Sequence, residues 1–134
     1  MGHTIWIEVY GRPGSETHND MGVLLRLDKQ LDVLAEKLDV VKITSFYDYR
    51  SLIEDRGVSE DELPDPVWFD SAIGLATFKA LRLCLEANWD ALGWTPDAGR
   101  EHWQRQIMND LQFCQSVLED AVLKGQAFRL LLVG

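Results

Sequence analysis

The side chains that could do chemistry in this chain include three histidines, two cysteines and many scattered carboxylates. His18 and Asp20 lie two residues apart, and His102 directly follows Glu101. Neither spacing matches the HExxH or Cys/His patterns that hold a metal. Adjacent helical residues point about 100° apart, so Glu101 is badly placed to orient His102 as a general base. We therefore predict no metal, no cofactor and no catalytic residue.

Two further motifs resemble active-site elements and fail on detail. Residues 11–15, GRPGS, follow a predicted strand, but they lack both the Gly-Lys-Ser/Thr ending of a phosphate loop and the GxGxxG spacing of a dinucleotide site. Asp70 and Ser71 are adjacent, yet there is no GxSxG motif around them. A helix start explains this pair, because its side-chain oxygens can accept hydrogen bonds from the free amides of the first turn.

The two cysteines, Cys84 and Cys114, each lie within a helical pattern. A free cysteine packs as a small hydrophobe, so we predict buried, reduced thiols. A disulfide would require the two helices to cross at these positions.

The net charge of −9 is concentrated in one short segment. Residues 54–70 hold seven acids and one base, whereas the flanking regions are close to balance. A negative field repels nucleic acid and anionic lipid and attracts cationic partners, over about 8 Å at physiological salt. We therefore expect no nucleic-acid or membrane partner. A solvated acidic loop that only aids solubility is the alternative.

Aromatic residues gather beside this acidic segment. If they are buried, they form core; if they are partly exposed among carboxylates, they form a surface suited to a cationic protein. The predicted partner-binding residues are Tyr47, Tyr49, Glu54, Asp55, Glu60, Asp61, Glu62, Asp65 and Trp68.

Three functions remain open from the sequence. The first is a non-enzymatic binding protein that engages a basic protein through residues 46–70, as an inhibitor or immunity-type protein would. The second is a small enzyme or ligand-binding protein whose pocket gathers Tyr47, Asp48, Trp68, Asp70 and a histidine. The third is a self-associating scaffold, a homo-oligomer that buries exposed tryptophans between subunits. The chain shows no signal peptide and no apolar run of about 20 residues, so a cytoplasmic location is expected.

In the first part of the chain, hydrophobic periodicity predicts a strand, a helix and a second strand. Residues 3–10 alternate between apolar and other side chains, and residues 11–20 read as a loop. Leucines at three- and four-residue steps predict a helix over residues 23–38, capped by Asn19 or Asp20. The β-branched residues 40–44 predict a strand parallel to the first, which would complete a βαβ unit.

The second part of the chain predicts two long helices and a final strand. Ser59 to Glu62 have the form of a capping box, which favours one helical turn. Helices are expected over residues 71–88 and from about residue 100, the latter capped by Gly125, and a strand over residues 127–133 is placed beside the first strand. We predict one globular domain over residues 1–134. Its class is α+β, with three main helices packed on a small two- or three-stranded sheet that contains both chain termini.

Overall fold

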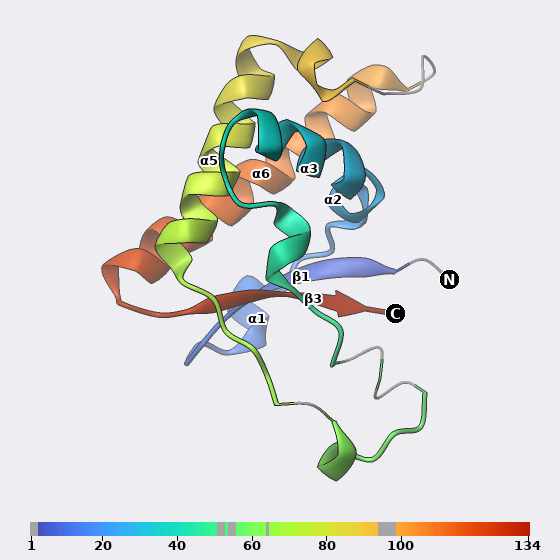
Figure 1. Cartoon of the computed structure of the whole chain (residues 1–134), viewed down its shortest axis with the longest axis vertical. Coiled ribbons are helices and arrows are strands. Elements are labelled where there is room, and N and C mark those ends of the chain that lie inside the picture. Colours follow the sequence, from blue (N-terminus) through green and yellow to red (C-terminus); the bar gives the residue numbers. More distant parts are fainter. Residues whose placement is uncertain (1–2, 51–52, 54–55, 64, 94–98) are drawn as a thin grey trace.

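The molecule is an α+β fold with three main helices packed on a small sheet, as predicted, and these helices lie on one side of the sheet (Figure 1). The computed structural model describes residues 3–50, 53, 56–63, 65–93 and 99–134. The strands are β1 (Thr4–Val9), β2 (Tyr47–Asp48) and β3 (Phe128–Val133). The main helices are α3 (Asp28–Lys37), α5 (Ser71–Ala87) and α6 (Arg100–Leu123). No helix among the described residues is long and apolar enough to cross a membrane.

Strands β1 and β3 pair antiparallel, which confirms the predicted neighbourhood of the first and last strands. Ile5, Ile7 and Val9 are almost fully buried, and their register partners on β3 are Leu132, Leu130 and Phe128. Directly opposed residues share a face of the sheet, so both strands present one apolar face to the helices. The other face carries the polar side chains of β1 and β3.

The predicted strand over residues 40–44 is wrong. Asp39, with φ 58°, ends the turn after α3, and residues Ile43–Phe46 form a 3₁₀ turn, η1. The carboxylate of Asp32 accepts hydrogen bonds from the Thr44 backbone N–H at 3.3 Å and from its hydroxyl at 2.7 Å, which favours a turn over a strand. The short β2 follows and pairs parallel with β3 instead of β1, so the predicted βαβ unit does not form.

The predicted helix over residues 23–38 is divided into α2 (Gly22–Arg26) and α3 by a break at Leu27. Neither predicted cap is used. Met21 occupies the N-cap position of α2, and the Asp20 carboxylate instead accepts a 2.6 Å hydrogen bond from the indole of Trp6. The region predicted as a loop before it also contains a single helical turn, α1 (Gly14–Thr17).

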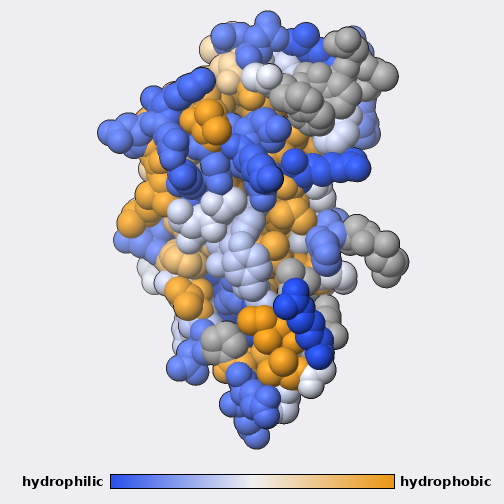
Figure 2. Space-filling view, turned by 45° about the vertical axis from the view of Figure 1, so that its right-hand side comes forward, coloured by the Kyte–Doolittle hydropathy of each residue, from blue (hydrophilic) through white to orange (hydrophobic). Residues whose placement is uncertain are grey.

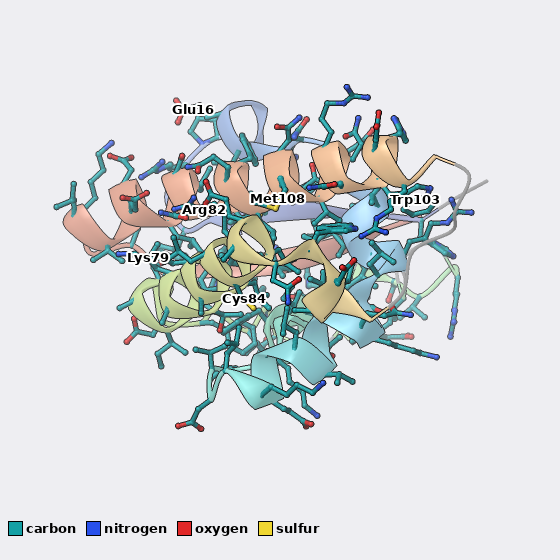
Figure 3. The ribbon with its side chains drawn as sticks, turned by 90° about the horizontal axis from the view of Figure 1, so that it is seen from above. Glu16, Lys79, Arg82, Cys84, Trp103 and Met108 are labelled. Atoms are coloured by element: carbon teal, nitrogen blue, oxygen red, sulfur yellow. The ribbon has the colours of Figure 1, made fainter. Side chains whose placement is uncertain are left out.

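Helices α5 and α6 form where they were predicted and pack side by side. Asp70 caps α5 by accepting a 2.8 Å hydrogen bond from the Ala72 N–H. In Figure 3, Arg82 of α5 and Met108 of α6 lie between the two helices, and Arg82 donates to Gln115 of α6 at 2.5 Å.

The end of α6 confirms the predicted glycine cap. Gly125 has φ 64° and donates its N–H to Val122, while Gln126 donates to Ala121. This pair of hydrogen bonds is a Schellman motif, which requires the left-handed backbone that glycine adopts freely. The helix begins at Arg100, where it was predicted, and Gly99 occupies its N-cap position.

Candidate functional site

Residues 49–68, here called the lobe, are held between two anchors on β3. Before the lobe, β2 pairs with β3; after the lobe, Phe69 and Phe128 exchange two backbone hydrogen bonds of 2.8 and 3.0 Å. Between these anchors the chain leaves the sheet on the side away from α3, α5 and α6 (Figure 1). The segment predicted to bind a partner is therefore a distinct projection whose two ends belong to the sheet.

The aromatic residues at the start of this segment belong to the core. Phe46 packs against the rings of Phe69 and Phe128, with centroids 5.6 and 5.0 Å apart. Tyr47 is only 9% exposed, and its hydroxyl donates to Asp28 at 3.0 Å. Burial, followed by the negative charge of Asp28, raises the pKa of Tyr47 well above its usual value. The prediction that Tyr47 forms part of an exposed docking surface is wrong.

An ionic cluster occupies the face of the sheet opposite α3, α5 and α6. Arg129 of β3 donates to Glu8 of β1 at 2.9 and 2.6 Å and to Asp48 of β2 at 2.7 Å. His18 lies 3.2 Å from the other oxygen of Glu8 and stacks on Trp6, with centroids 4.4 Å apart. The guanidinium therefore joins all three strands and compensates two carboxylates in a largely buried position.

Trp68, at the end of the lobe, lies over this cluster. Its ring centroid is 4.5 Å from the guanidinium carbon of Arg129, a distance at which a cation and an aromatic face attract each other. Tyr10, which is 60% exposed, meets the ring of Trp68 edge-on at 5.2 Å. The cluster thus fixes one aromatic residue of the lobe and, through it, an exposed tyrosine outside the lobe.

The other end of the lobe is shaped by Asp48. Its second carboxylate oxygen accepts a 2.7 Å hydrogen bond from the N–H of Arg50, an Asx turn that directs the chain away from the strand. Tyr49 consequently leaves the core and is 52% exposed, although its ring still contacts Tyr47 edge-on at 6.2 Å. Of the two possibilities that the sequence left open for these aromatic residues, Tyr49 follows the exposed one.

A pocket of about 230 Å³ opens between the two ends of the lobe. Exposed Tyr49 and Val67, partly buried Ile53 and buried Tyr47 supply its apolar lining, and exposed Asp65 adds a carboxylate. The space-filling view shows apolar surface at this lower end of the molecule among hydrophilic atoms (Figure 2). The full lining is Tyr47, Asp48, Tyr49, Arg50, Ile53, Asp65 and Val67.

The acidic residues of the lobe that the structure describes point into solvent. Asp61 and Glu62 belong to a 3₁₀ turn, η2 (Glu60–Glu62), which lies where the capping box predicted a helical turn. Leu63 follows it and is buried, so the turn is attached by an apolar side chain. Among the described residues, Asp61, Glu62 and Asp65 form no ion pair. The predicted Glu54 and Asp55, and the side chain of Glu60, lie outside the described structure.

The residues of the alternative pocket are not gathered in one hollow. Asp48, Trp68 and His18 are linked through Arg129 and Glu8, but Asp70 caps α5 and lines a separate pocket of about 460 Å³. In that pocket the hydroxyl of Ser71 donates to the Gln126 carbonyl at 2.5 Å, so it is engaged as a structural hydrogen bond. The described residues contain no group of three potential metal ligands.

His18 itself is packed in place. A Cβ built on Gly14 would lie 2.5 Å from the imidazole ring, so the backbone of α1 presses against one side of His18 while Trp6 stacks on it. Its contacts with Glu8, Trp6 and Gly14 tie α1 to β1. The other two histidines, His3 and His102, are exposed.

The residues of the site that sequence reasoning missed include Tyr10, Val67 and Arg129. Arg129 had a usable signal, because it is the single charged residue in the apolar run 127–133, and a charge within a strand of this kind usually has a buried partner. Tyr10 and Val67 had no such signal in the sequence, since their exposure depends on how the lobe is placed relative to the sheet.

Comparison of the chain with protein-family models, curated proteins and solved structures finds no match, so its function has to be inferred from these residues.

Proposed function

We propose that this chain is a non-enzymatic binding protein that engages a basic protein through the lobe, as an inhibitor or immunity-type protein would. The observation that carries the proposal is that exposed Tyr49 and Val67 lie in the same lobe as carboxylates without a described ion-pair partner. They share a pocket with Asp65 and belong to the same lobe as Asp61 and Glu62, and no described basic residue pairs with these three carboxylates.

The two kinds of side chain have different roles in such an interface. Large exposed side chains such as Tyr49 supply affinity, because a partner can bury them and exclude water. The carboxylates attract a positive surface during approach and disfavour acidic partners. Surface charges act over about 8 Å at physiological salt, so the carboxylates speed encounter more than they strengthen the final contact.

The attachment of the lobe supports the same proposal. Its ends are fixed by β2 and by Phe69, and Trp68 is held over Arg129. Side chains at these two ends are already held in place, and groups held in place lose less conformational entropy on binding, which favours affinity. The ionic cluster therefore serves as the support of the surface, and its own charges are compensated internally.

Charge reversal tests the proposal. Asp61→Lys with Glu62→Lys should weaken capture of a basic protein from a lysate of the source organism by about tenfold, which equals about 1.4 kcal/mol. The matched control is Glu101→Lys with Glu119→Lys, which changes the net charge equally at exposed sites of α6. Quantitative mass spectrometry of the captured proteins, at low salt and at physiological salt, gives the readout.

A basic protein that is lost with the lobe variant, retained with the α6 variant and released by salt supports the proposal. Its interaction is then measured with the purified partner. If both variants capture the same proteins in the same amounts as the unchanged chain, the lobe is not the binding surface and the proposal fails.

A further inference from the structure

We propose that the pocket between Tyr49 and Val67 receives one lysine or arginine side chain of the basic partner. This inference rests on the proposed function, and it names the chemical group that the lobe recognises. The pocket is the hollow in the lobe that combines apolar walls, an exposed aromatic ring and an acidic residue, Asp65.

The walls of the pocket fit the aliphatic part of such a side chain. Val67 is 56% exposed, Ile53 is partly buried, and buried Tyr47 also belongs to the lining. Lysine and arginine pack their methylene groups along apolar surface and keep the charged end beside polar groups or water. A chain of methylenes would therefore cover apolar surface that is open to solvent in the free protein.

The charged end of the incoming side chain has two partners in the lining. Asp65 is exposed and forms no ion pair with a described residue, and the Tyr49 ring offers an aromatic face to a cation. Asp48 contributes little attraction, because its carboxylate is already bound to Arg129 and to the Arg50 N–H. Arg50 also lines the pocket and is itself engaged, so Asp65 and Tyr49 are the groups that select a cation.

Small side-chain analogues test the pocket without the partner. The ¹⁵N-labelled protein is titrated with N-acetyl-lysine amide, N-acetyl-arginine amide and N-acetyl-norleucine amide, the last having the lysine stem without its charge. Saturable shifts confined to the amides of Tyr49, Ile53, Asp65 and Val67 are expected with a cationic probe and not with norleucine. Equal shifts with norleucine, or no localised shift with either cation, overturn the proposal.

Two matched pairs of variants assign the recognition to its residues. Asp65→Asn should weaken the cationic probe about threefold, as for a partly exposed ion pair, whereas Asp61→Asn, outside the pocket lining, should not. Tyr49→Phe should retain binding and Tyr49→Leu, which keeps an apolar side chain without a ring, should reduce it. If Asp65→Asn and Asp61→Asn bind alike, the carboxylate has no role and the inference fails.

The results separate this inference from the function on which it rests. Loss of partner capture with the charge-reversed lobe, together with no probe binding, would retain the binding protein and reject the pocket. Probe binding that responds to Asp65 supports the pocket whether or not a lysate yields a partner.

Discussion

At the scale of single residues, Arg129 connects more of the molecule than any sequence feature indicated. Its guanidinium contacts Glu8 and Asp48 on the neighbouring strands and lies under Trp68. Removing one member of a buried ionic cluster costs more than the interaction itself, because the remaining charges stay buried without compensation. The cluster is thus a point at which a single substitution affects both the sheet and the lobe.

Arg129→Met should lower the free energy of unfolding by about 3 kcal/mol, because it leaves Glu8 and Asp48 as uncompensated carboxylates. Urea unfolding followed by circular dichroism measures the loss. The control is Arg100→Met, which breaks an exposed ion pair with Asp90 and should cost less than about 1 kcal/mol. Equal losses in the two variants would contradict the role given to the cluster.

Residue roles were predictable where they depend on local chain geometry. Asp70 precedes a long apolar helical pattern and does cap α5. Asp20 also precedes a helix, but Trp6, 14 residues earlier, takes its carboxylate. When a side chain can either cap a helix or accept a hydrogen bond from a distant donor, the tertiary structure determines which bond forms. Local sequence does not contain that information.

At the scale of elements, α5 approaches β3 closely at Gly74. A Cβ on Gly74 would lie 2.3 Å from the ring of Phe128 and 3.3 Å from Leu118. Glycine is a poor helix former, costing about 1 kcal/mol relative to alanine, so its presence in α5 reflects this contact. The absence of a side chain lets the helix lie directly on the aromatic ring.

Gly74→Ala should therefore destabilise the protein by about 1–3 kcal/mol in spite of its better helix propensity, since Phe128 is fully buried and has little room to move. Gly22→Ala in α2 is the matched control, because its Cβ would make only a 3.8 Å contact with the His3 carbonyl. The control should change stability by less than about 0.5 kcal/mol. Thermal unfolding of both variants checks the difference, and a neutral Gly74→Ala would show that the contact is loose.

Elements with a long, strong period were predicted well, and short ones were not. The stripe of α6 and the alternation of β1 and β3 extend over enough residues to identify the element. The β-branched run 40–44 is too short to distinguish a strand from a turn. The hydrogen bonds from Thr44 to Asp32 favour the turn that forms. The break at Leu27 is likewise hidden, because its leucine stripe continues across it.

At the scale of the whole molecule, stability should depend on pH through Asp110. This residue of α6 is only 6% exposed, and burial raises its pKa from 3.8 to about 7. Burial of the nearby Cys114 thiol, followed by the negative charge of Asp110, raises the pKa of that thiol well above its usual value. Cys114 and partly buried Cys84 are both free thiols.

At a pH well below 3.8, the Asp110 carboxyl is protonated in both the folded and the unfolded chain and does not affect stability. As the pH rises from about 4 to about 7, the unfolded chain releases this proton while the folded chain keeps it, so stability falls across that window. Asp110→Asn should therefore be more stable than the unchanged chain at pH 8, by at most roughly 4 kcal/mol, with the difference vanishing near pH 4.

Urea unfolding at intervals between pH 4 and pH 8 measures this difference. Glu119→Gln removes the same charge from an exposed site of α6 and is the matched control. A difference between the Asp110→Asn protein and the unchanged chain that stays constant across the range would exclude a raised pKa.

The candidate site was predictable in part at this scale. The concentration of acids and aromatics in one segment is a sequence property, and it singled out the part of the chain that contains exposed Tyr49, but it left open whether these rings are buried or exposed. Which of these aromatic residues are buried and which are exposed was not predictable, because buried Phe46 and Tyr47 precede the exit of the chain from the sheet by only a few residues. A shift of one residue in a strand reverses which side chains are buried.

The order of the strands, β1-β3-β2, has a consequence for biosynthesis. The middle strand is translated after both of its neighbours, so neither β1 nor β2 has its partner until residues 128–133 have emerged from the ribosome. Both anchors of the lobe and the guanidinium under Trp68 belong to that same late strand. The nascent chain therefore closes both ends of the lobe in the same step that forms its most sequence-distant strand pairing.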